Sequence, residues 1–316
     1  MYLVTGGAGF IGSNLVQALL ADGKKVRVLD NFLTGKRENL AGLSETYGDA
    51  FELVEGDLRN LEGTRRAVEG AAYVLHQGAL PSVPRSVADP VLSNEINVGG
   101  TLSLLVAARD AGVKRVVYAA SSSAYGDTPE LPKRESMATN PKSPYAAQKL
   151  VGEQYMRIFH EVYGVETISL RYFNVFGPKQ DPESTYAAVI PRFITAVLSG
   201  ASPTIYGDGL QTRDFSYIDN VVRANILACD APREACGRVV NVACGERVSL
   251  LDILEVLYGL ADRRLSPRFE PARAGDVRDS LADISLAKEL LGYEPVVPFP
   301  EGLSRTFTYF HQRGRS

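Results

Sequence analysis

The sequence is poor in the residues that build disulfide frameworks and metal centres. Its 316 residues contain 3 Cys, 3 His and no Trp. The cysteines are odd in number and lack the spacing of a zinc site, so we expect buried thiols in a reducing compartment. The histidines are far apart in the sequence, which predicts no metal site. These residues are Cys229, Cys236, Cys244, His76, His160 and His311.

Charge and hydropathy exclude further classes of protein. The net charge of -3 gives no footprint of nucleic-acid binding and no polybasic patch for a membrane surface. No apolar run approaches the roughly 18 residues of a membrane helix. No basic and apolar leader follows Met1. We therefore expect a cytoplasmic protein with no nucleic-acid or membrane partner.

Short apolar runs alternate with helical stretches through the first half of the chain. The runs are nearly continuous, as in strands buried on both faces of a parallel sheet. We predict strands at 2–5, 25–30, 51–55, 73–76, 115–120 and 167–172, and helices at 10–21, 61–69, 92–111 and 143–163. This alternation predicts a Rossmann-type, doubly wound parallel α/β fold.

The pattern changes after Phe173. A turn-rich segment at 177–182 precedes helices at 187–198, 219–230, 249–261 and 285–291 and short strands at 203–209 and 238–243. Asp219, Ser249 and Ser285 are the expected N-caps of the last three helices. Because regular alternation is missing, we predict a smaller α/β substrate-binding lobe of residues 175–214 and 236–316. Residues 1–174, with about 215–235, would form the nucleotide-binding domain.

A glycine-rich loop follows the first strand and opens the first helix. Gly6, Gly9 and Gly12 form G-x-x-G-x-x-G. Gly6 permits the tight turn, Gly9 lets the backbone approach a pyrophosphate, and Gly12 allows close packing of helix and strand. The position of the motif after an N-terminal strand favours a dinucleotide site over a plain turn.

Acidic residues end the second and third strands. Asp30 is placed to bind both ribose hydroxyls, and its charge repels a 2′-phosphate. NAD is therefore favoured over NADP, although Lys36 and Arg37 leave NADP open. Asp57-Leu58 either reads the adenine or is a surface turn.

A possible catalytic pair lies on the helix at 143–163. Tyr145 and Lys149 form Y-x-x-x-K, which places both side chains on one face of a helix. A nearby ammonium stabilises the phenolate, so Tyr145 is a plausible base. The motif is common by chance, but a serine-rich segment, 121–126, follows the fifth strand, where ligands bind in such sheets.

Together these segments and Arg171-Tyr172-Phe173-Asn174 resemble the extended short-chain dehydrogenase/reductase family over nearly the whole chain. The resemblance is strongest to UDP-hexose 4-epimerases, especially those acting on UDP-N-acetylhexosamines. It implies NAD as cofactor, a UDP-sugar as substrate and a homodimer packed through helices 92–111 and 143–163. It also implies Ser121 as the catalytic serine beside Tyr145 and Lys149, because Ser121 lies four residues before the Tyr of Tyr125-Gly126.

The resemblance implies two sets of binding residues. The cofactor set is Gly6, Gly9, Phe10, Ile11, Gly12, Asp30, Asn31, Gly35, Asp57, Leu58, Gly78, Ala79, Asn97, Tyr145, Lys149 and Tyr172. The substrate set is Ser82, Ser121, Ser122, Ser123, Tyr145, Asn174, Ala188, Val189, Tyr206, Arg213, Arg273, Asp276 and Ser280.

Several of these positions bear on the reaction and the substrate. Dehydratases and decarboxylases of the family that the chain resembles carry carboxylates at these positions, where this chain has Ser122-Ser123. The resemblance therefore implies epimerisation through a transient 4-keto sugar. Arg213 and Arg273 would hold the diphosphate, and Asp276 the uridine ribose. Ser280 matches a position beside the sugar C2 group, and its small size implies room for an N-acetyl group.

Two alternatives stay open at this stage. A UDP-glucuronate 4-epimerase needs a polar or cationic pocket for C6 of the sugar, and Arg85 could serve it. A non-enzymatic NAD-binding regulator is the other alternative. It is disfavoured because such proteins tend to lose the Tyr or the Lys, and this chain keeps both.

Overall fold

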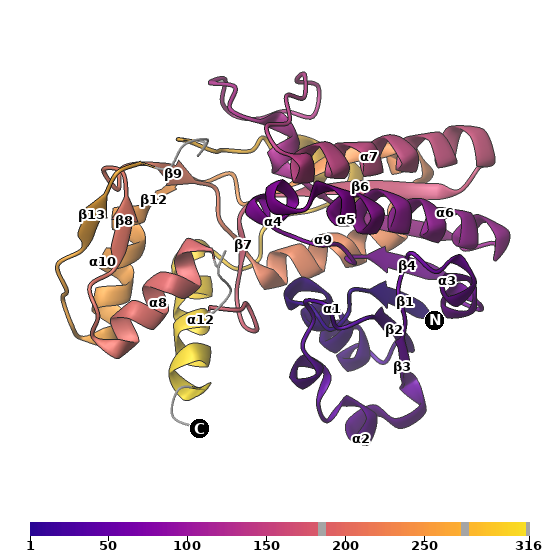
Figure 1. Ribbon diagram of the computed structural model, residues 1–316, viewed down its shortest axis with the longest axis horizontal. Coiled ribbons are helices and arrows are strands. Elements are labelled where there is room, and N and C mark those ends of the chain that lie inside the picture. Colours follow the sequence, from indigo (N-terminus) through magenta and orange to yellow (C-terminus); the bar gives the residue numbers. More distant parts are fainter. Residues whose placement is uncertain (183–187, 273–277, 314–316) are drawn as a thin grey trace.

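The protein is described by a computed structural model that covers residues 1–182, 188–272 and 278–313. Its main sheet has seven strands in the order β11-β6-β5-β4-β1-β2-β3, and every neighbouring pair is parallel (Figure 1). The strands are β1 (Tyr2–Thr5), β2 (Val26–Asp30), β3 (Phe51–Glu55), β4 (Tyr73–His76), β5 (Arg115–Ser121), β6 (Glu166–Tyr172) and β11 (Arg238–Val242). The predicted Rossmann-type α/β fold is confirmed.

Helices cover both faces of this sheet, which explains the nearly continuous apolar strands. Successive strand residues point to opposite faces. Val4 accordingly joins the core beneath α1 (Phe10–Ala21) and α9 (Ile218–Asp230). Leu3 joins a second core with Leu104 of α6 (Gly100–Asp110) and Met156 of α7 (Pro144–Tyr163), beside α3 (Leu61–Val68).

The helix predicted at 92–111 is longer and less regular than expected. It consists of α5 (Pro90–Asn94), a π-helical turn η3 (Glu95–Gly99) and α6. By length and composition the stretch Pro90–Asp110 passes as a membrane-spanning helix, with a mean hydropathy of 1.2. However, 50% of it is buried within the fold, where it packs on α3 and α7. Core helices of globular proteins have this property as well.

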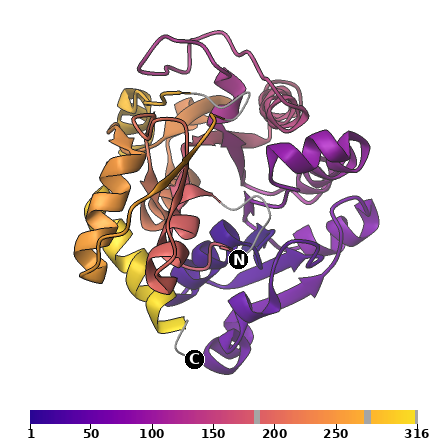
Figure 2. The same ribbon diagram turned by 60° about the vertical axis from the view of Figure 1, so that its left-hand side comes forward.

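A smaller unit lies beside the carboxyl ends of the main strands. Figure 2 shows its helices grouped on one side of the molecule, opposite β1–β3. Three two-stranded pairs, β7–β10, β8–β13 and β9–β12, accompany these helices. The helices are α8 (Val189–Ser199), α10 (Leu250–Ala261), α11 (Ser285–Leu291) and α12 (Phe299–Arg313). The strands are β7 (Val175–Phe176), β8 (Thr204–Tyr206), β9 (Thr212–Arg213), β10 (Ser216–Tyr217), β12 (Val248–Ser249) and β13 (Arg268–Glu270).

The core of the smaller unit is continuous with the core of the main sheet. Phe193 of α8 and Leu254 of α10 belong to the same buried cluster as Val4 of β1. The topology also bears on the predicted division of the chain. Residues 236–316 were expected in the smaller lobe, but β11 forms the edge of the main sheet by pairing with β6. We therefore place residues 238–242 with the larger unit.

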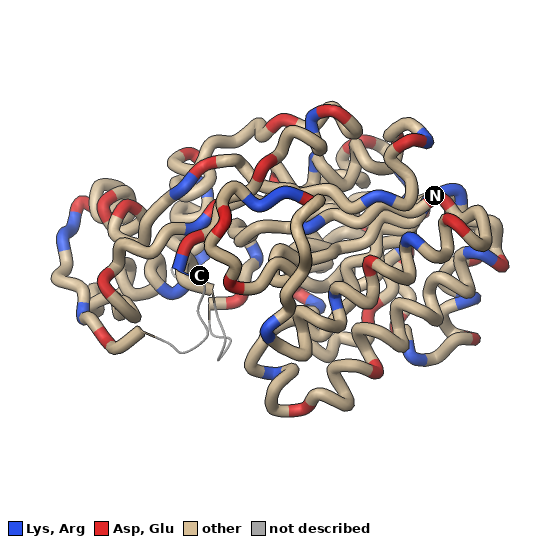
Figure 3. The backbone as a smooth tube through the Cα atoms, turned by 90° about the horizontal axis from the view of Figure 1, so that it is seen from above, with Lys and Arg blue, Asp and Glu red and all other residues tan. Residues whose placement is uncertain are grey.

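Short elements complete the chain between these units. They are α2 (Leu43–Tyr47), α4 (Val83–Ala88) and the short 3-10 turns η1 (Arg37–Leu40), η2 (Gly48–Ala50), η4 (Ser122–Tyr125) and η5 (Arg233–Ala235). Lys and Arg are interspersed with Asp and Glu over the molecule in the view of Figure 3. In the described residues no group of three or more His, Cys, Asp or Glu is arranged to hold a metal ion. Cys229 and Cys236 are buried as expected, whereas Cys244 is partly exposed.

One of the three expected helix caps is confirmed and two are wrong. Ser249 caps α10 in a full capping box with Asp252. Asp219 lies inside α9, whose N-cap is Tyr217, and its carboxylate pairs with Arg305. Ser285 also lies inside its helix, which is preceded by Ile284.

Candidate active site

A cavity of about 610 Å³ opens at the carboxyl ends of β1, β2, β4 and β5. It is lined by every residue of the predicted cofactor set except Asn97, and by Ser82 and Ala188 of the substrate set. We call it the larger cavity. Its position agrees with the rule that ligands of doubly wound sheets bind outside the carboxyl ends of the strands.

The glycine loop forms one wall of the larger cavity. Gly6 has a φ of +66°, and a Cβ there would lie 2.7 Å from the Gly78 backbone. A Cβ at Gly12 would lie 2.2 Å from the Gly6 carbonyl oxygen. Gly9 is the N-cap of α1, and a Cβ on it would meet only the Gly6 carbonyl oxygen, at 3.2 Å. The loop therefore leaves the first turn of α1 open to a phosphate group, whose charge a helix N-terminus favours.

Asp30 lies at the end of β2 beside this loop. Its Oδ2 accepts a hydrogen bond from the Ala8 amide at 2.9 Å, and its Oδ1 accepts one from the Phe32 amide at 2.8 Å. Burial raises the pKa of the Asp30 carboxyl above its usual value, and the two amide bonds oppose that rise. Each oxygen keeps a further lone pair for a ribose hydroxyl.

The two cations that left NADP open are paired with carboxylates. Lys36 Nζ lies 3.3 Å from Asp181, and Arg37 Nη2 lies 2.5 Å from Glu55. The Arg37 guanidinium also lies over the Phe32 ring, 3.9 Å from its centroid. These partners compete with a 2′-phosphate for both side chains.

The region of the predicted adenine contact is held by a network around Asp57. Arg59 binds both carboxylate oxygens, at 3.0 Å and 2.8 Å, and Asn31 donates to Oδ2 at 2.9 Å. The hydrogen bond from Arg59 is the main cause that lowers the pKa of Asp57 to about 2. Leu58 is buried against Gly78 and Gly100. The segment is therefore a rigid wall of the larger cavity.

Tyr145 and Lys149 occupy the first turns of α7, which Ser143 caps at the Ala146 amide. The Lys149 ammonium donates to the Ala119 carbonyl at 2.8 Å and lies 6.0 Å from the centre of the Tyr145 ring. Burial raises the pKa of Tyr145 to about 12, opposed by a hydrogen bond with Ser121. Burial lowers the pKa of Lys149 to about 8, opposed by the charge of Glu153.

The serine segment follows β5 directly. Ser121 is the last residue of that strand, and its Oγ accepts hydrogen bonds from the Ser123 amide at 3.2 Å and the Ser123 hydroxyl at 2.8 Å. The neighbouring Ala119 and Ala120 line the larger cavity, whereas Ser121, Ser122 and Ser123 do not. Ser121 thus reaches the site through the Tyr145 hydroxyl.

Asn97 is placed differently from the other predicted cofactor residues. It lies in the π-helical turn η3, 1% exposed, and its side chain binds both backbone groups of Leu80, at 2.7 Å and 3.2 Å. It also donates to Gln148 Oε1 at 2.8 Å. Asn97 therefore fixes the loop that follows β4 from behind, where Leu80, Pro81 and Ser82 line the larger cavity.

A buried relay joins this region to β1. The hydroxyl of Thr101 donates to the Asn97 carbonyl at 2.6 Å, so its oxygen accepts from His76 Nε2, 2.9 Å away. His76 Nδ1 then accepts from the Thr5 hydroxyl at 2.7 Å, and the Thr5 oxygen accepts from the Gly78 amide at 3.1 Å. Burial lowers the pKa of His76 to about 3, which keeps this histidine neutral.

A second, smaller cavity of about 260 Å³ adjoins the larger one, since Ala188 lines both. Asn174, Val189, Tyr206 and Arg213 of the substrate set line it. Ser280 does not, because its hydroxyl accepts from Asn174 Nδ2 at 3.2 Å and from the Asp214 amide at 3.3 Å. Arg273 and Asp276 lie outside the described residues.

Several residues of the two cavities are absent from the predicted sets. Gln77 and Lys179 line the larger cavity, and Arg192 and Gln211 line the smaller one. The sequence offered one signal for these residues, because Lys179 and Gln211 lie in turn-rich segments that follow predicted strands. Asn225 of α9 was not expected either, and its side chain binds the Tyr172 hydroxyl at 2.8 Å.

Comparison with known proteins agrees with this geometry. The model of the NAD dependent epimerase/dehydratase family matches residues 2–243. The chain is 40% identical to a UDP-glucose 4-epimerase of Mycolicibacterium smegmatis over 99% of both chains.

Two solved structures share the fold over almost the whole chain. A UDP-N-acetylglucosamine 4-epimerase of Methanobrevibacter ruminantium, in complex with UDP-N-acetylmuramic acid, has a TM-score of 0.93 at 40% identity, covering 99% of this chain and 98% of that one. A UDP-glucuronic acid 4-epimerase variant of Bacillus cereus, with NAD and UDP-4-deoxy-4-fluoro-glucuronic acid, has a TM-score of 0.91 at 32% identity, covering 99% of both. The chain therefore belongs to the NAD-dependent epimerase/dehydratase family.

Proposed function

We propose that the protein is an NAD-dependent 4-epimerase of UDP-hexoses, with UDP-GlcNAc and UDP-GalNAc as its preferred pair and UDP-Glc and UDP-Gal as further substrates. One observation carries the proposal. Tyr145 and Lys149 line a cavity whose other end has a glycine loop and a ribose-binding acid, and this cavity adjoins a second one through Ala188. We place the dinucleotide in the larger cavity and the UDP group in the smaller one, with the sugar extending past Ala188 toward Tyr145.

The residues of the larger cavity fit NAD. The glycine loop offers amides to the pyrophosphate, Asp30 offers acceptors to the adenosine ribose, and Lys149 lies near the opposite end. Bound there, NAD would accept a hydride from C4 of the sugar and return it to the other face of the ring. Because the cofactor is restored in each cycle, it can stay bound.

The protein side chains would handle the proton of the 4-hydroxyl. Tyr145 accepts this proton and later returns it, and Ser121, which shares a hydrogen bond with Tyr145, holds the C4 oxygen. Accepting this proton requires a phenolate, but the pKa of Tyr145 is raised to about 12, mainly by burial and despite the hydrogen bond with Ser121. The ammonium of Lys149, together with the positive charge of a bound nicotinamide, opposes this effect of burial.

The smaller cavity would anchor the UDP group while the sugar turns. Arg213 lies on its wall, held by bonds from Nη1 to the Thr212 and Arg278 carbonyls at 2.9 Å and 2.7 Å. A guanidinium fixed in this way suits a diphosphate. Asn174, Val189 and Tyr206 complete the proposed contacts, with Arg273 for the diphosphate and Asp276 for the uridine ribose.

Two arguments bear on the choice of hexose. The small side chain of Ser280 lies behind Asn174, which lines the smaller cavity, and we place the N-acetyl group at C2 beside this pair. UDP-glucuronate is the second candidate, because Arg85 lines the larger cavity beside Ser82 and a similar structure is a UDP-glucuronic acid 4-epimerase.

A direct test mixes the purified protein with UDP-GalNAc, UDP-Gal or UDP-GlcA, without added cofactor, and separates the products by anion exchange. We expect UDP-GalNAc to be converted to UDP-GlcNAc faster than UDP-Gal to UDP-Glc. Conversion of UDP-GlcA alone would overturn the choice of hexose, and no conversion at all would overturn the function. Tyr145→Phe should keep its NAD and lose about 10²–10⁴-fold in turnover.

We further propose a cytoplasmic homodimer that packs through the helical segments 92–111 and 143–163, which correspond to α5, η3 and α6 and to α7. Val91 of α5 and Val162 of α7 are 68% and 66% exposed, and these two helices contact each other. Val151, Ile158 and Tyr163 of α7 and Val87 of the neighbouring α4 are also exposed apolar side chains. Light scattering should give twice the 34.2 kDa of one chain, and a Val91→Glu/Val162→Glu variant should be monomeric. Val296→Glu, at a distant site that is 53% exposed, is the control.

A further inference from the structure

The 177–182 loop crosses from the smaller unit to the glycine loop. It leaves β7 and reaches the first turn of α1, where Asn14 Nδ2 donates to the Pro178 carbonyl at 3.2 Å and to the Phe10 carbonyl at 2.8 Å. Further along, Asp181 pairs with Lys36 at 3.3 Å. The loop is therefore attached to the wall of the larger cavity on both sides of Lys179.

The side chain of Lys179 lines the larger cavity. Its ammonium donates to the Asn39 carbonyl at 2.9 Å, and Asn39 Nδ2 donates in turn to the Ala8 carbonyl of the glycine loop at 2.8 Å. This places a positive charge within two hydrogen bonds of the glycine loop. The partner of the ammonium is a neutral carbonyl, so the bond orients the charge without neutralising it.

The other cations of the cavity have different surroundings. Lys36 is paired with Asp181, and Lys149 is bound to Ala119 near Tyr145. Arg85 lies on α4 beside Ser82, after β4. Lys36 and Lys179 both lie near the glycine loop. Among the described residues Lys36 is paired with a carboxylate, whereas the hydrogen-bond partner of Lys179 is an uncharged carbonyl. Burial lowers the pKa of Lys179 to about 8, so the side chain is charged at neutral pH at a cost that an anion would offset.

The backbone of Lys179 supports a role for its side chain. Its φ is +68°, a left-handed conformation that glycine adopts freely and other residues at a cost of about 1 kcal/mol. Glycine would satisfy the turn better than lysine does. The lysine therefore occupies a position that the backbone alone does not favour.

We propose that Lys179 binds the pyrophosphate of the dinucleotide, opposite the amides of the glycine loop. The loop amides and the dipole of α1 supply only a partial positive charge, about half an elementary charge, whereas a pyrophosphate carries two negative charges. Lys179 supplies one further full positive charge from the side of the smaller unit. It binds the cofactor and takes no part in proton transfer at the sugar. The inference rests on the proposed use of NAD.

The test measures binding and needs no turnover. The affinities of the cofactor-free protein for ADP-ribose, which has the pyrophosphate, and for adenosine, which lacks it, are compared by calorimetry. Lys179→Met should weaken ADP-ribose about tenfold or more, the size of one charge-assisted hydrogen bond, and leave adenosine within about twofold. Purified Lys179→Met should also carry less NAD than the wild type.

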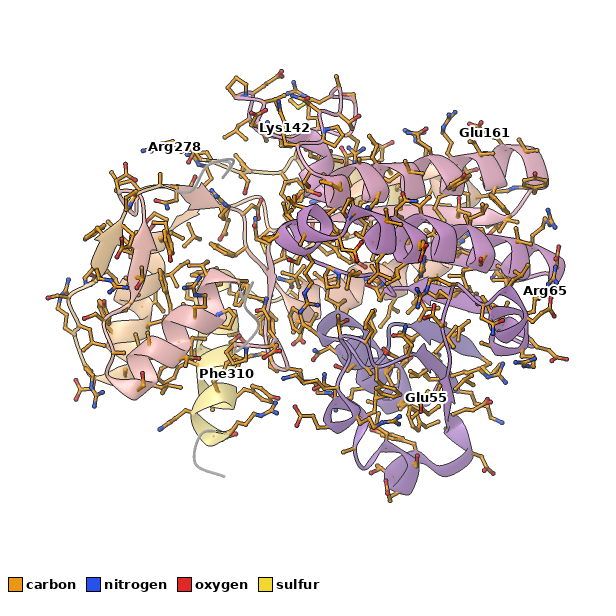
Figure 4. All side chains as sticks on the ribbon, viewed as in Figure 1. Glu55, Arg65, Lys142, Glu161, Arg278 and Phe310 are labelled. Carbon is orange, nitrogen blue, oxygen red and sulfur yellow. The ribbon has the colours of Figure 1, made fainter. Side chains whose placement is uncertain are left out.

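Three further variants separate charge from folding. Lys179→Gly suits the left-handed backbone, so it should fold at least as well as the wild type and still lose affinity for ADP-ribose. Lys179→Arg should restore most of that affinity. Lys142→Met is the control, because Lys142 lies on the loop before α7, is 51% exposed and pairs with Asp127 (Figure 4).

An affinity of Lys179→Met and Lys179→Gly for ADP-ribose equal to that of the wild type would overturn the inference, as would an equal loss for adenosine. Failure of the proposed function is distinguishable from this result. A protein that binds ADP-ribose through Lys179 and epimerises no UDP-sugar would keep this inference and lose the epimerase function.

Discussion

A buried ion pair links the proposed catalytic helix to β6, the strand next to the edge strand β11, and its removal gives a quantitative prediction. Arg171 of β6 binds Glu153 of α7 through two bonds, Nε to Oε1 at 2.9 Å and Nη2 to Oε2 at 2.7 Å. The side chains are 4% and 1% exposed. Removing one partner leaves the other charge buried and unpaired, which costs about 3–5 kcal/mol of unfolding free energy.

The double variant separates this cost from a loss of packing. Arg171→Met and Glu153→Leu should each cost about 3–5 kcal/mol. The double variant leaves no unpaired charge, so it should cost less than the sum of the two, with a coupling energy of about 2 kcal/mol or more. Urea unfolding followed by far-UV circular dichroism measures all three, since the chain has no Trp to report by fluorescence.

A matched control lies on the same helix. Arg157 and Glu161 of α7 form a pair at 3.1 Å whose side chains are 52% and 54% exposed. Arg157→Met should cost less than about 1 kcal/mol. Additive effects of Arg171→Met and Glu153→Leu, or single costs no larger than that of the control, would refute the reasoning.

The same pair should influence the proposed chemistry. Glu153 follows Lys149 by one helical turn, and its charge opposes the burial that lowers the pKa of Lys149 to about 8. Without Glu153 the pKa of Lys149 should fall further, so its ammonium would be lost at lower pH. As the pH is raised, we therefore expect Glu153→Leu to lose turnover earlier than the wild type does. Alkaline limbs of the two pH profiles that coincide would contradict this.

Three further predictions follow from buried or paired carboxylates and cations. Burial raises the pKa of Asp214 from 3.8 to about 6 in the folded protein. The folded state therefore binds this proton more tightly than the unfolded state, which contributes about 3 kcal/mol to stability below pH 3.8. This contribution is lost as the pH rises from 3.8 through about 6. Asp214→Asn should flatten the urea stability profile across that range, and an unchanged slope would contradict this. Arg115 binds the Ala228 carbonyl at the end of α9 at 2.8 Å, so Arg115→Leu should cost about 2–4 kcal/mol by urea unfolding and the exposed Arg109→Leu less than about 1. Asp30→Asn should lower the affinity for NAD about tenfold and reduce the ratio of the NAD affinity to the NADP affinity, both measured by calorimetry. An unchanged ratio would argue against a contact between Asp30 and the ribose.

The sequence predicted the inner strands of the sheet well because they are buried on both faces. Continuous apolar runs such as 73–76 and 167–172 are unfavourable in contact with water and therefore indicate buried strands. Their positions matched β4 and β6 closely. The glycine loop and Asp30 could be placed for the same reason, since the loop follows the carboxyl end of β1 and Asp30 is the last residue of β2. The edge strand β11 was assigned to the other unit, because its own sequence carries no information about its partner.

Side-chain orientation and loop crossings could not be predicted. Asn97 was expected at the cofactor, but its carboxamide turns to Leu80 and Gln148, a choice set by residues far along the chain. The cap expected at Asp219 was wrong because α9 already begins at Ile218, and helix ends are difficult to place from sequence to within one or two residues. The 177–182 loop appeared only as a turn, and its attachment to α1 depends on the whole fold.

The fate of the hydrogen at C4 tests the central claim most directly. The purified protein is given UDP-GalNAc deuterated at C4, without added cofactor, and the UDP-GlcNAc formed is analysed by mass spectrometry and NMR. Transient oxidation within a closed site returns the same hydrogen to the same carbon, so we predict deuterium at C4 of the product and no incorporation when the reaction is run in D₂O. Loss of the label to solvent, or product only when NAD is supplied in stoichiometric amounts, would contradict the account.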